Sequence, residues 1–461
     1  MNQANRSTSI KRQPIDAGSK KQRGQALIYG IFVLIGGLAA LFFLFNSGQL
    51  AREKTKLVNT ADAAAYSGGL MNARALNYQA YANRVMVANT VAIAQLVSLS
   101  SWIEYADSYA AAGQGTAYVD QNTGKYFFSV FASNLAAQTV GTALQSSLNA
   151  GPLELIARTL DNLNWNILGP AQVAVFAGTD ASRMAVMNEV ANLNYTNDGA
   201  ITVEQNPAAL AQFASFTKMY RGDERIRFAE VASRSAEKDK FVSDRNWRLT
   251  GLYSSCPLDF VVFNRDYIDR RGGTELVGFD DWRASDSLTE FMRRTKFRRF
   301  FGVRIPTGCE YFGIPNGYGD QSASVGGGAS SSSWDYKGLP PFADFSQSTL
   351  DSPDEPKMLT GIRLTRNASQ TQTSEARSGI KSSARLNNYE AQMAGGDQMA
   401  AVSTSEVFFQ RDEATKDNPY GAGLGKPKEI GSLFNPYWHV KLVQSDANVR
   451  AAQLLQGVVL P

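Results

Sequence analysis

The 461-residue sequence is poor in the residues that most catalytic and metal sites require. It contains one histidine, His439, and only two cysteines. A zinc site built from several histidines and cysteines is therefore excluded, and so is a disulfide-dense scaffold. Catalysis by a Ser-His-Asp or Cys-His arrangement would depend on His439 alone. No P-loop or dinucleotide fingerprint is present either. We expect no enzyme activity, no cofactor, no metal ion and no small-molecule substrate.

Charged residues are also few, and their distribution is uneven. They make up 19% of the chain, and the formal net charge is +4. Residues 1–24 hold one acid, Asp16, and the following basic residues: Arg6, Lys11, Arg12, Lys20, Lys21 and Arg23. This basic tail accounts for the whole positive balance, so the remainder is close to neutral. We therefore expect no nucleic-acid partner for the chain as a whole.

A long uncharged run follows the basic tail. Residues 26–45 read ALIYGIFVLIGGLAALFFLF, and twenty helical residues match the thickness of a hydrocarbon core. A buried core helix and a cleaved secretory signal are the alternatives, but we favour an uncleaved signal anchor. Its representative residues are Ala26, Leu27, Ile28, Phe32, Leu34, Leu41 and Phe45. The positive-inside rule then predicts a single-pass protein of the bacterial inner membrane, with residues 1–24 cytoplasmic and the bulk periplasmic or extracellular.

Two short motifs flank this anchor, which spans residues 25–45. Gly24 and Gln25 precede the apolar run, and the sequence NTADAAA follows it. The motif residues are Gly24, Gln25, Asn59, Ala61, Asp62, Ala63 and Ala64. Residues 21–70 resemble the N-terminal region of TadE/TadG-like proteins of the Flp (Tad) pilus assembly system. Residues 405–409 and 433–438 are similar, more weakly, to the ending of longer TadG-like chains.

The resemblance implies a structural role. It suggests a TadG-like minor pilin or pseudopilin-like component whose partners are the membrane and other pilin-like or Tad assembly proteins. Pilins of this system are cut after a glycine and carry a glutamate five residues into the mature chain. Here Gly24 would be the cut site and the fifth residue is Tyr29. This departure fits a TadG-like protein that stays unprocessed.

The segment after the anchor, residues 46–112, is predicted to continue as a helical stem. Residues 49–112 lack proline and are rich in alanine, the best helix former. Small and apolar residues form a stripe close to helical spacing: Leu50, Leu57, Ala61, Ala64 and Gly68. This stripe suits packing against like helices, as in a pilin-type stem. The alternative is an ordinary core helix beneath the following domain.

The rest of the chain is predicted to be α+β. Residues 113–250 look mainly helical, with one helix starting at Pro152 and running through Leu163. Residues 251–461 look like a mixed α+β exported domain, with a helix starting within residues 286–291 and strands at residues 300–305 and 402–410. The Gly/Ser-rich residues 317–338 are expected to form a flexible loop.

The predicted topology bears on whether the two cysteines form a disulfide. Cys256 and Cys309 would both lie outside the cytoplasm, where disulfides persist. A bridge between them would stabilise the fold by about 4 kcal/mol in the chain-entropy model. Two free, buried cysteines are the alternative.

A basic and aromatic stretch at residues 291–304 is the clearest candidate interaction site. We single out Arg293, Arg294, Arg298 and Arg299 for docking. Three interpretations stay open: a structural amphipathic segment, docking on an acidic partner or lipid headgroups, and nucleic-acid binding. The acids at positions 280, 281, 286 and 290 lie just upstream and could neutralise the patch.

The leading hypothesis is a non-enzymatic, membrane-anchored component that helps to build or anchor an adhesive Flp/Tad pilus. The alternatives are a membrane-tethered envelope enzyme or ligand-binding protein, and a surface adhesin subunit. The sequence DxSxS at Asp344 resembles a Mg²⁺ motif of von Willebrand A domains. We do not predict a metal there, because the two prolines just before it argue against the central strand that such a site requires.

Overall fold

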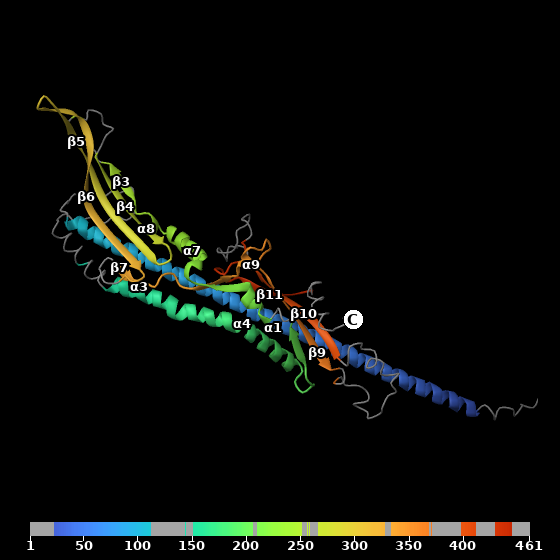
Figure 1. Cartoon of the computed structure of the whole chain (residues 1–461). Helices are drawn as coiled ribbons and strands as arrows, with labels where there is room; N and C mark the ends of the chain where they lie inside the picture. The colour runs from blue at the N-terminus through green and yellow to red at the C-terminus, as the bar shows by residue number, and fades with distance from the viewer. Residues whose placement is uncertain are drawn as a thin grey trace, which may run out of the picture.

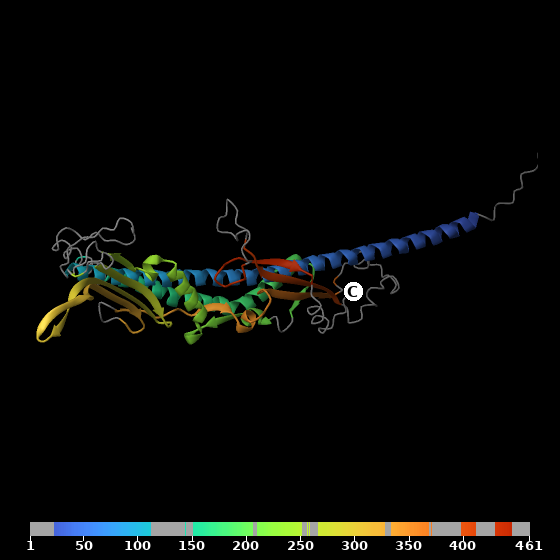
Figure 2. The same cartoon turned by 90° about the horizontal axis from the view of Figure 1, so that it is seen from above.

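A computed structural model shows an elongated molecule assembled along one helix (Figure 1). It describes residues 23–111, 143, 151–205, 210–250, 256, 258, 266–327, 333–367, 370, 398–411 and 429–444. Helix α1 (Arg23–Ala111) has 89 residues. At 1.5 Å per residue it is about 130 Å long. The 90° view shows that α1 curves gently and that the folded part of the chain covers only its C-terminal portion (Figure 2).

The continuity of α1 follows from its composition. No proline interrupts residues 23–111, and alanine is frequent throughout. Within the described residues, α1 is the one helix that is long and apolar enough to cross a membrane. The predicted N-terminal apolar helix is therefore confirmed, and the same helix continues through the predicted stem.

A second helical layer lies along α1 and runs back toward the anchor. It consists of α3 (Pro152–Leu163), the π-helical η2 (Asn164–Leu168) and α4 (Gly169–Asn194). The predicted helix from Pro152 is confirmed. Pro170 has no N–H to donate to the preceding turn, so it accounts for the π-helical irregularity directly before it.

Two main sheets pack on α1 at different positions along its length. The membrane-proximal sheet has the strand order β1-β9-β10-β11 and is antiparallel throughout. The distal sheet has the order β3-β4-β5-β6-β7, with β7 parallel to β6 and the other pairs antiparallel. A two-stranded pair, β2-β8, lies between them in the fold.

The strand bounds in chain order are as follows: β1 (Thr202–Gln205), β2 (Thr217–Tyr220), β3 (Trp247–Thr250), β4 (Tyr267–Val277), β5 (Asp281–Phe300), β6 (Val303–Ser324), β7 (Ser333–Asp335), β8 (Phe342–Phe345), β9 (Met358–Asn367), β10 (Gln398–Phe409) and β11 (Trp438–Val443). The remaining short helices are α6 (Gln212–Phe216), η3 (Gly222–Glu224), α7 (Ile226–Glu237), α8 (Lys240–Ser243) and α9 (Gln347–Leu350). The chain is thus mixed helix and strand, and the strand predicted at residues 402–410 is confirmed within β10.

The hydrophobic core is a series of clusters strung along α1. Near the anchor, Leu57, Ala61 and Ala64 pack with residues of α4 and the proximal sheet. At the far end, Ile93 and Val97 pack beneath Trp282 and other residues of the distal sheet. The helix from residue 57 onward is therefore the central element of the folded region.

The helix predicted to start within residues 286–291 is wrong, because these residues lie in β5. From Trp282 to Leu288 the side chains alternate between buried and exposed, which is the period of a strand. The strand predicted at residues 300–305 is wrong in its middle, where Phe301 and Gly302 form the turn between β5 and β6. The Gly/Ser-rich loop is shorter than predicted, since β6 continues to Ser324 and β7 begins at Ser333.

Candidate functional site

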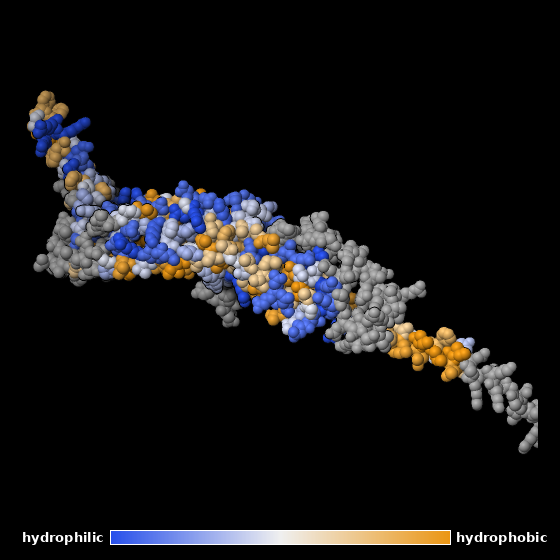
Figure 3. Space-filling model, turned by 60° about the horizontal axis from the view of Figure 1, so that its bottom comes forward, coloured by the Kyte–Doolittle hydropathy of each residue, from blue (hydrophilic) through white to orange (hydrophobic). Residues whose placement is uncertain are grey.

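The first candidate is the apolar start of α1, which no other part of the described chain covers. Leu27, Phe32 and Val33 are 69%, 69% and 74% exposed, and they point to three different sides of the helix. None of the most apolar window is buried. Figure 3 shows this segment as an apolar rod that projects from an otherwise mixed surface. A core helix would be covered, so this exposure fits a lipid environment.

An ionic cluster closes the fold onto α1 just after the apolar run. The membrane-proximal ionic cluster consists of Glu53, Lys56, Tyr195, Asp198 and Arg366. Lys56 Nζ lies 2.5 Å from Asp198 Oδ2, and Arg366 pairs with both Glu53 and Asp198. Both cations lie over the Tyr195 ring, at 4.1 and 4.6 Å from its centroid. Burial, and then the Asp198 charge, raises the pKa of Tyr195 to about 12.

This cluster marks the point along α1 at which the folded part of the chain begins. Glu53 lies eight residues beyond Phe45, which is about 12 Å along the helix. The cluster joins α1 to the end of α4 and to β9, so the folded part of the chain is attached to α1 shortly after the apolar run. Burial also lowers the pKa of Arg366, whose side chain is only 1% exposed.

The NTADAAA motif faces the chain's own core. Ala61 and Ala64 are fully buried, whereas Asn59 is exposed and Ala63 is half-buried. The Asp62 carboxylate accepts a hydrogen bond of 2.6 Å from the Ser403 hydroxyl of β10. The motif therefore joins α1 to the proximal sheet and α4. The other two motif residues, at positions 24 and 25, lie in the first turn of α1.

Two glycines after the motif allow a very close approach. A Cβ on Gly68 would lie 2.5 Å from Met187 Sδ of α4. A Cβ on Gly69 would lie 2.6 Å from Ser405 Oγ of β10. The small-residue stripe from Leu57 onward is consequently occupied within the chain. The prediction that it packs against like helices is wrong there, and the alternative of a core helix describes it correctly.

A second ionic group joins α1 to the distal sheet. We call Ser101, Arg245, Arg270 and Asp286 the distal ionic lock. The Asp286 carboxylate is fully buried and pairs with Arg245 at 2.8 Å and with Arg270 at 2.6 Å. The Ser101 hydroxyl of α1 donates to the same carboxylate at 2.6 Å. Because every partner is buried, the lock holds structure together and is closed to a substrate.

Aromatic contact reinforces the distal ionic lock. The Arg270 guanidinium lies 3.6 Å from the centroid of the Tyr105 ring, and burial raises the pKa of Tyr105. Gly272 and Gly319 leave no room for side chains beside the lock. A Cβ at Gly272 would lie 2.1 Å from Asp286 Oδ1, and one at Gly319 would lie 2.1 Å from the Ser101 carbonyl oxygen.

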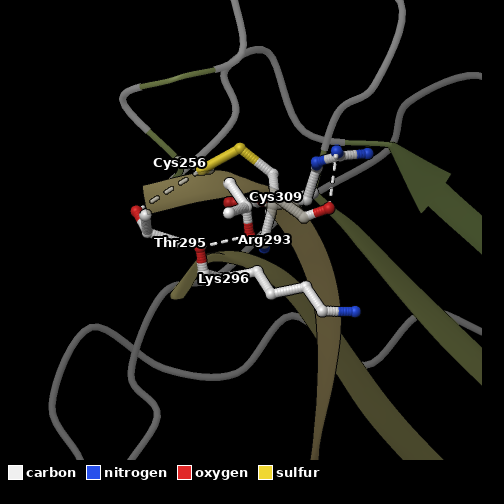
Figure 4. Close-up of a disulfide and its surroundings, with 7 residues drawn as sticks. Cys256, Arg293, Thr295, Lys296 and Cys309 are labelled. Carbon is white, nitrogen blue, oxygen red and sulfur yellow. Dashed lines mark hydrogen bonds between the residues drawn. A yellow bond between two sulfur atoms is a disulfide. The ribbon is translucent and has the colours of Figure 1, made fainter. Parts of the chain in front are cut away.

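The long β5–β6 hairpin projects from the distal sheet (Figure 1), and its strand β6 carries Cys309. Cys256 and Cys309 are bridged, with their Cα atoms 6.1 Å apart. Cys309 lies opposite Thr295 in the hairpin register, and the Cys256 sulfur lies 3.6 Å from the Thr295 hydroxyl (Figure 4). The bridge therefore ties the stem of the hairpin to the segment around residue 256.

The four arginines singled out for docking fall into two pairs. Arg293 donates to the Cys309 carbonyl at 3.4 Å, and Arg294 pairs with Glu310 at 3.1 Å, so both are held against β6. Arg298 and Arg299 lie closer to the tip. Among the described residues, no carboxylate lies within salt-bridge distance of either.

The acids expected to neutralise this patch lie elsewhere. Asp280 pairs with Arg225, Asp281 with Arg283, and Asp286 with Arg245 and Arg270; Glu290 accepts a hydrogen bond from Asn316. That expectation is therefore wrong. Each of these acids has a partner outside residues 291–304, and none of them reaches the arginines at the tip.

The remaining titratable candidates have structural surroundings. Asp344 is fully buried and pairs with Arg227 at 2.7 Å, and burial raises its pKa to about 6. It lies in β8, which forms directly after the two prolines that had argued against a strand here. His439 packs beside Phe408, and its Nε2 lies 3.0 Å from the Gln410 carbonyl oxygen.

Neither a metal cluster nor a ligand cavity stands out. The part of the chain that the structure describes contains no group of three or more metal-ligating side chains. One pocket of about 740 Å³ lies on the distal sheet. Only Ala284 among its ten lining residues has an apolar side chain, whereas ligand pockets are mostly apolar.

Comparison with known proteins identifies the N-terminal helix. Residues 24–75 match the family described as Putative Flp pilus-assembly TadE/G-like (Tad). No curated protein and no solved structure matches the chain. The match covers the apolar run, the membrane-proximal cluster residues of α1 and the NTADAAA motif. Residues 24–75 of this chain are therefore similar to the TadE/G-like domain of Flp pilus-assembly proteins.

Proposed function

We propose that this protein is a membrane-anchored, non-enzymatic structural component of Flp/Tad pilus assembly. The observation that carries the proposal is the coincidence of the Tad match with the uncovered apolar segment. Residues 24–75 match the family, and residues 26–45 within them are exposed on every side. Helix α1 would hold the chain in the membrane and present the folded region to other pilin-like or Tad assembly proteins.

The orientation follows from charge. The basic tail would remain in the cytoplasm, and the ectodomain would lie in the periplasm or outside the cell. The bridge between Cys256 and Cys309 supports this orientation, because disulfides persist in oxidising compartments. A role as a TadG-like minor pilin agrees with the absence of an acid in the apolar run and with a permanent anchor.

The least covered surface that α1 offers to a neighbouring pilin-like helix is its start. Residues 26–45 are uncovered and contain Gly30, Gly36 and Gly37, around which nothing lies within 4 Å. Small residues allow membrane helices to approach closely. Contacts between α1 and like helices would therefore form mainly along residues 26–45, inside the bilayer, whereas the NTADAAA motif would act by fixing the ectodomain to the helix.

Gene deletion tests the function. Cells that lack the protein should carry fewer Flp pili and adhere less, and the wild-type gene supplied in trans should restore both. Pili that are normal in number and adhesion without the gene would contradict the proposal. Sequencing the N-terminus of the membrane-extracted protein tests the permanent anchor: Met1 agrees with it, and Gln25 would mean processing after Gly24.

Two single-cysteine probes test the orientation. Ser7→Cys lies in the basic tail, and Ser215→Cys lies at an exposed position of the ectodomain. With a membrane-impermeant maleimide, Ser215→Cys should react in intact spheroplasts and Ser7→Cys only after lysis. The reverse pattern would overturn the topology. Free thiols at Cys256 or Cys309 in the untreated exported protein would contradict the bridge, and mass spectrometry without reductant measures them.

A further inference from the structure

The tip of the β5–β6 hairpin lies far from the membrane anchor. From Phe45 to Ala111 the helix extends for about 100 Å. The hairpin then projects past the end of α1, on the opposite side of the molecule from the apolar segment (Figures 1 and 3). The tip therefore cannot lie in the bilayer that holds a roughly upright anchor.

The apex of this hairpin is apolar and uncovered. Phe301 is 94% exposed, Phe300 is 64% exposed and Val303 is 63% exposed. The rings of Phe300 and Phe301 lie edge to face, with centroids 4.9 Å apart, and both stay largely exposed. Loop tips are ordinarily polar, so a grouped apolar apex points to a partner.

The turn itself contains an unfavourable residue. Phe301 has φ of 44° and Gly302 has φ of 80°. A two-residue turn with both φ angles positive favours Asn-Gly, because a bulky side chain is strained in the left-handed region. Phenylalanine thus weakens the turn at the most exposed position of the hairpin, which suggests that its ring has another use.

Cations lie directly behind the apex. Arg299 and Arg304 are opposite one another in the register, and Arg298 lies one residue farther from the turn. Like charges opposite one another destabilise a strand pair. The sequence contains no acid between Phe291 and Cys309, and no described carboxylate pairs with any of these three arginines. An anionic partner would relieve this repulsion.

The layering fits a lipid surface better than a protein groove. One face of the hairpin carries Phe297 with Arg299 and Arg304, and the other carries Phe300 and Val303 with Arg298 and Ile305. Both faces thus combine apolar and basic side chains, whereas a groove on a partner protein would contact only one face of the hairpin. Successive residues are about 3.3 Å apart, so rings at the acyl boundary would place the arginines at the level of lipid phosphates.

We propose that the β5–β6 hairpin tip inserts into an anionic lipid bilayer distinct from the one that holds the anchor. The residues that carry binding are Phe300, Phe301, Val303, Arg298, Arg299 and Arg304. The bridge at Cys309 holds the hairpin stem, so that little conformational freedom is lost on insertion. The protein would then connect two membrane surfaces.

The test uses the full chain with its anchor enclosed in a nanodisc of neutral phosphatidylcholine. The nanodiscs are mixed with vesicles of phosphatidylcholine, or of an equimolar mixture with phosphatidylglycerol, and bound protein is measured by flotation. We expect binding to the anionic vesicles that weakens with salt, and little binding to the neutral ones. Absence of binding to the anionic vesicles, or equal binding to both, would overturn the proposal.

Two variants separate the two parts of the tip. Phe301→Asn restores a favoured turn residue, so the protein should fold at least as well while binding falls about tenfold. Changing Arg298, Arg299 and Arg304 together to Gln should reduce binding about a hundredfold. The matched control changes three exposed cations of the α7–α8 region, Arg234, Lys238 and Lys240, to Gln and should bind as the wild type does.

The remaining outcomes are equally decisive. Unchanged binding by both tip variants, or an equal loss in the control, would overturn the proposal by placing the contact elsewhere. Binding of the nanodisc to polyglutamate but not to anionic vesicles would overturn it in favour of an acidic protein partner. None of these readouts requires pilus assembly, so the proposed function can fail while this inference holds, and the reverse.

Discussion

The two halves of α1 are parts of one continuous helix with opposite surroundings. Residues 26–45 are uncovered on every side, and their large side chains are leucine, isoleucine, phenylalanine, valine and one tyrosine, Tyr29. From Leu57 onward the helix is covered on several sides, and its buried positions are mostly alanine, small polar residues and glycine. The large apolar side chains are thus uncovered, as a membrane anchor requires, while the small ones let protein elements approach.

This contrast shows that the most hydrophobic part of α1 is not its most buried part. In the second half, buried polar side chains such as Asn83 and Gln79 donate hydrogen bonds to carbonyl oxygens of distant segments. Specific partners replace water there. The first half has no such partners among the described residues, and its exposed apolar surface fits a lipid environment.

The largest effect is expected from breaking the distal ionic lock. Asp286→Ala would leave Arg245 and Arg270 buried without their carboxylate, which should lower the free energy of unfolding by about 3–5 kcal/mol. Thermal unfolding of the full chain in detergent measures this loss. Asp354→Ala, at an exposed position, is the control. An equally small change in both variants would mean that α1 is not fixed to the distal sheet.

A charge introduced into each half of α1 tests the difference in solvent. Leu34→Arg should disfavour membrane insertion by about 3 kcal/mol, so more protein should be extracted by carbonate. Val85→Arg adds the same charge at a position of the second half that is 42% exposed, and it should remain in the membrane fraction. Similar behaviour of the two variants would remove the distinction between lipid-facing and water-facing segments.

A leucine at a glycine in each half tests the difference in packing. Gly68→Leu should lower stability by about 1–3 kcal/mol, because the new side chain would overlap Met187 and Arg183. Gly36→Leu enters open space and should leave the unfolding temperature of the ectodomain unchanged. Destabilisation by Gly36→Leu alone would show that the anchor, and not residue 68, makes the close contact.

The smallest effect is a pH dependence within the covered half. Asp161 of α3 is buried, and desolvation raises its pKa to about 6 even though the Lys337 amide donates to it. Because the folded pKa lies above the unfolded one, stability is greatest at low pH and is lost as pH rises through 6. Relative to Asp161→Asn, the wild type should gain about 1 kcal/mol between pH 7 and pH 5. A difference that stays constant with pH would contradict the raised pKa.

Local signals were sufficient for the N-terminal part of α1. The apolar run, the absence of proline and the NTADAAA motif all lie within residues 24–75, and they predicted the helix and the family. The use of the small-residue stripe could not be read in the same way. Gly68 meets Met187, which lies 119 positions away along the chain, and periodicity does not say which surface will cover a stripe.

Long-range pairing explains the predictions that were wrong beyond α1. Asp286 looked like part of a helix start, but its neighbours alternate in burial and its partners are Arg245 and Arg270 on other segments. The basic and aromatic residues of the hairpin were visible in the sequence, whereas the redirection of the nearby acids was not. Whether Arg298 and Arg299 were neutralised depended on a strand register that the sequence does not display.

The unbroken course of α1 makes the angle of the anchor in the bilayer a determinant of reach. In the proposed arrangement the same helix forms the anchor and the core of the ectodomain, so the two parts are joined without a break and tilt together. Membrane helices commonly tilt by about 20°, and over roughly 100 Å such a tilt moves the far end sideways by about 30 Å. Bilayer thickness, or a neighbouring helix that sets the tilt, would thereby determine which positions the distal end of this protein can reach.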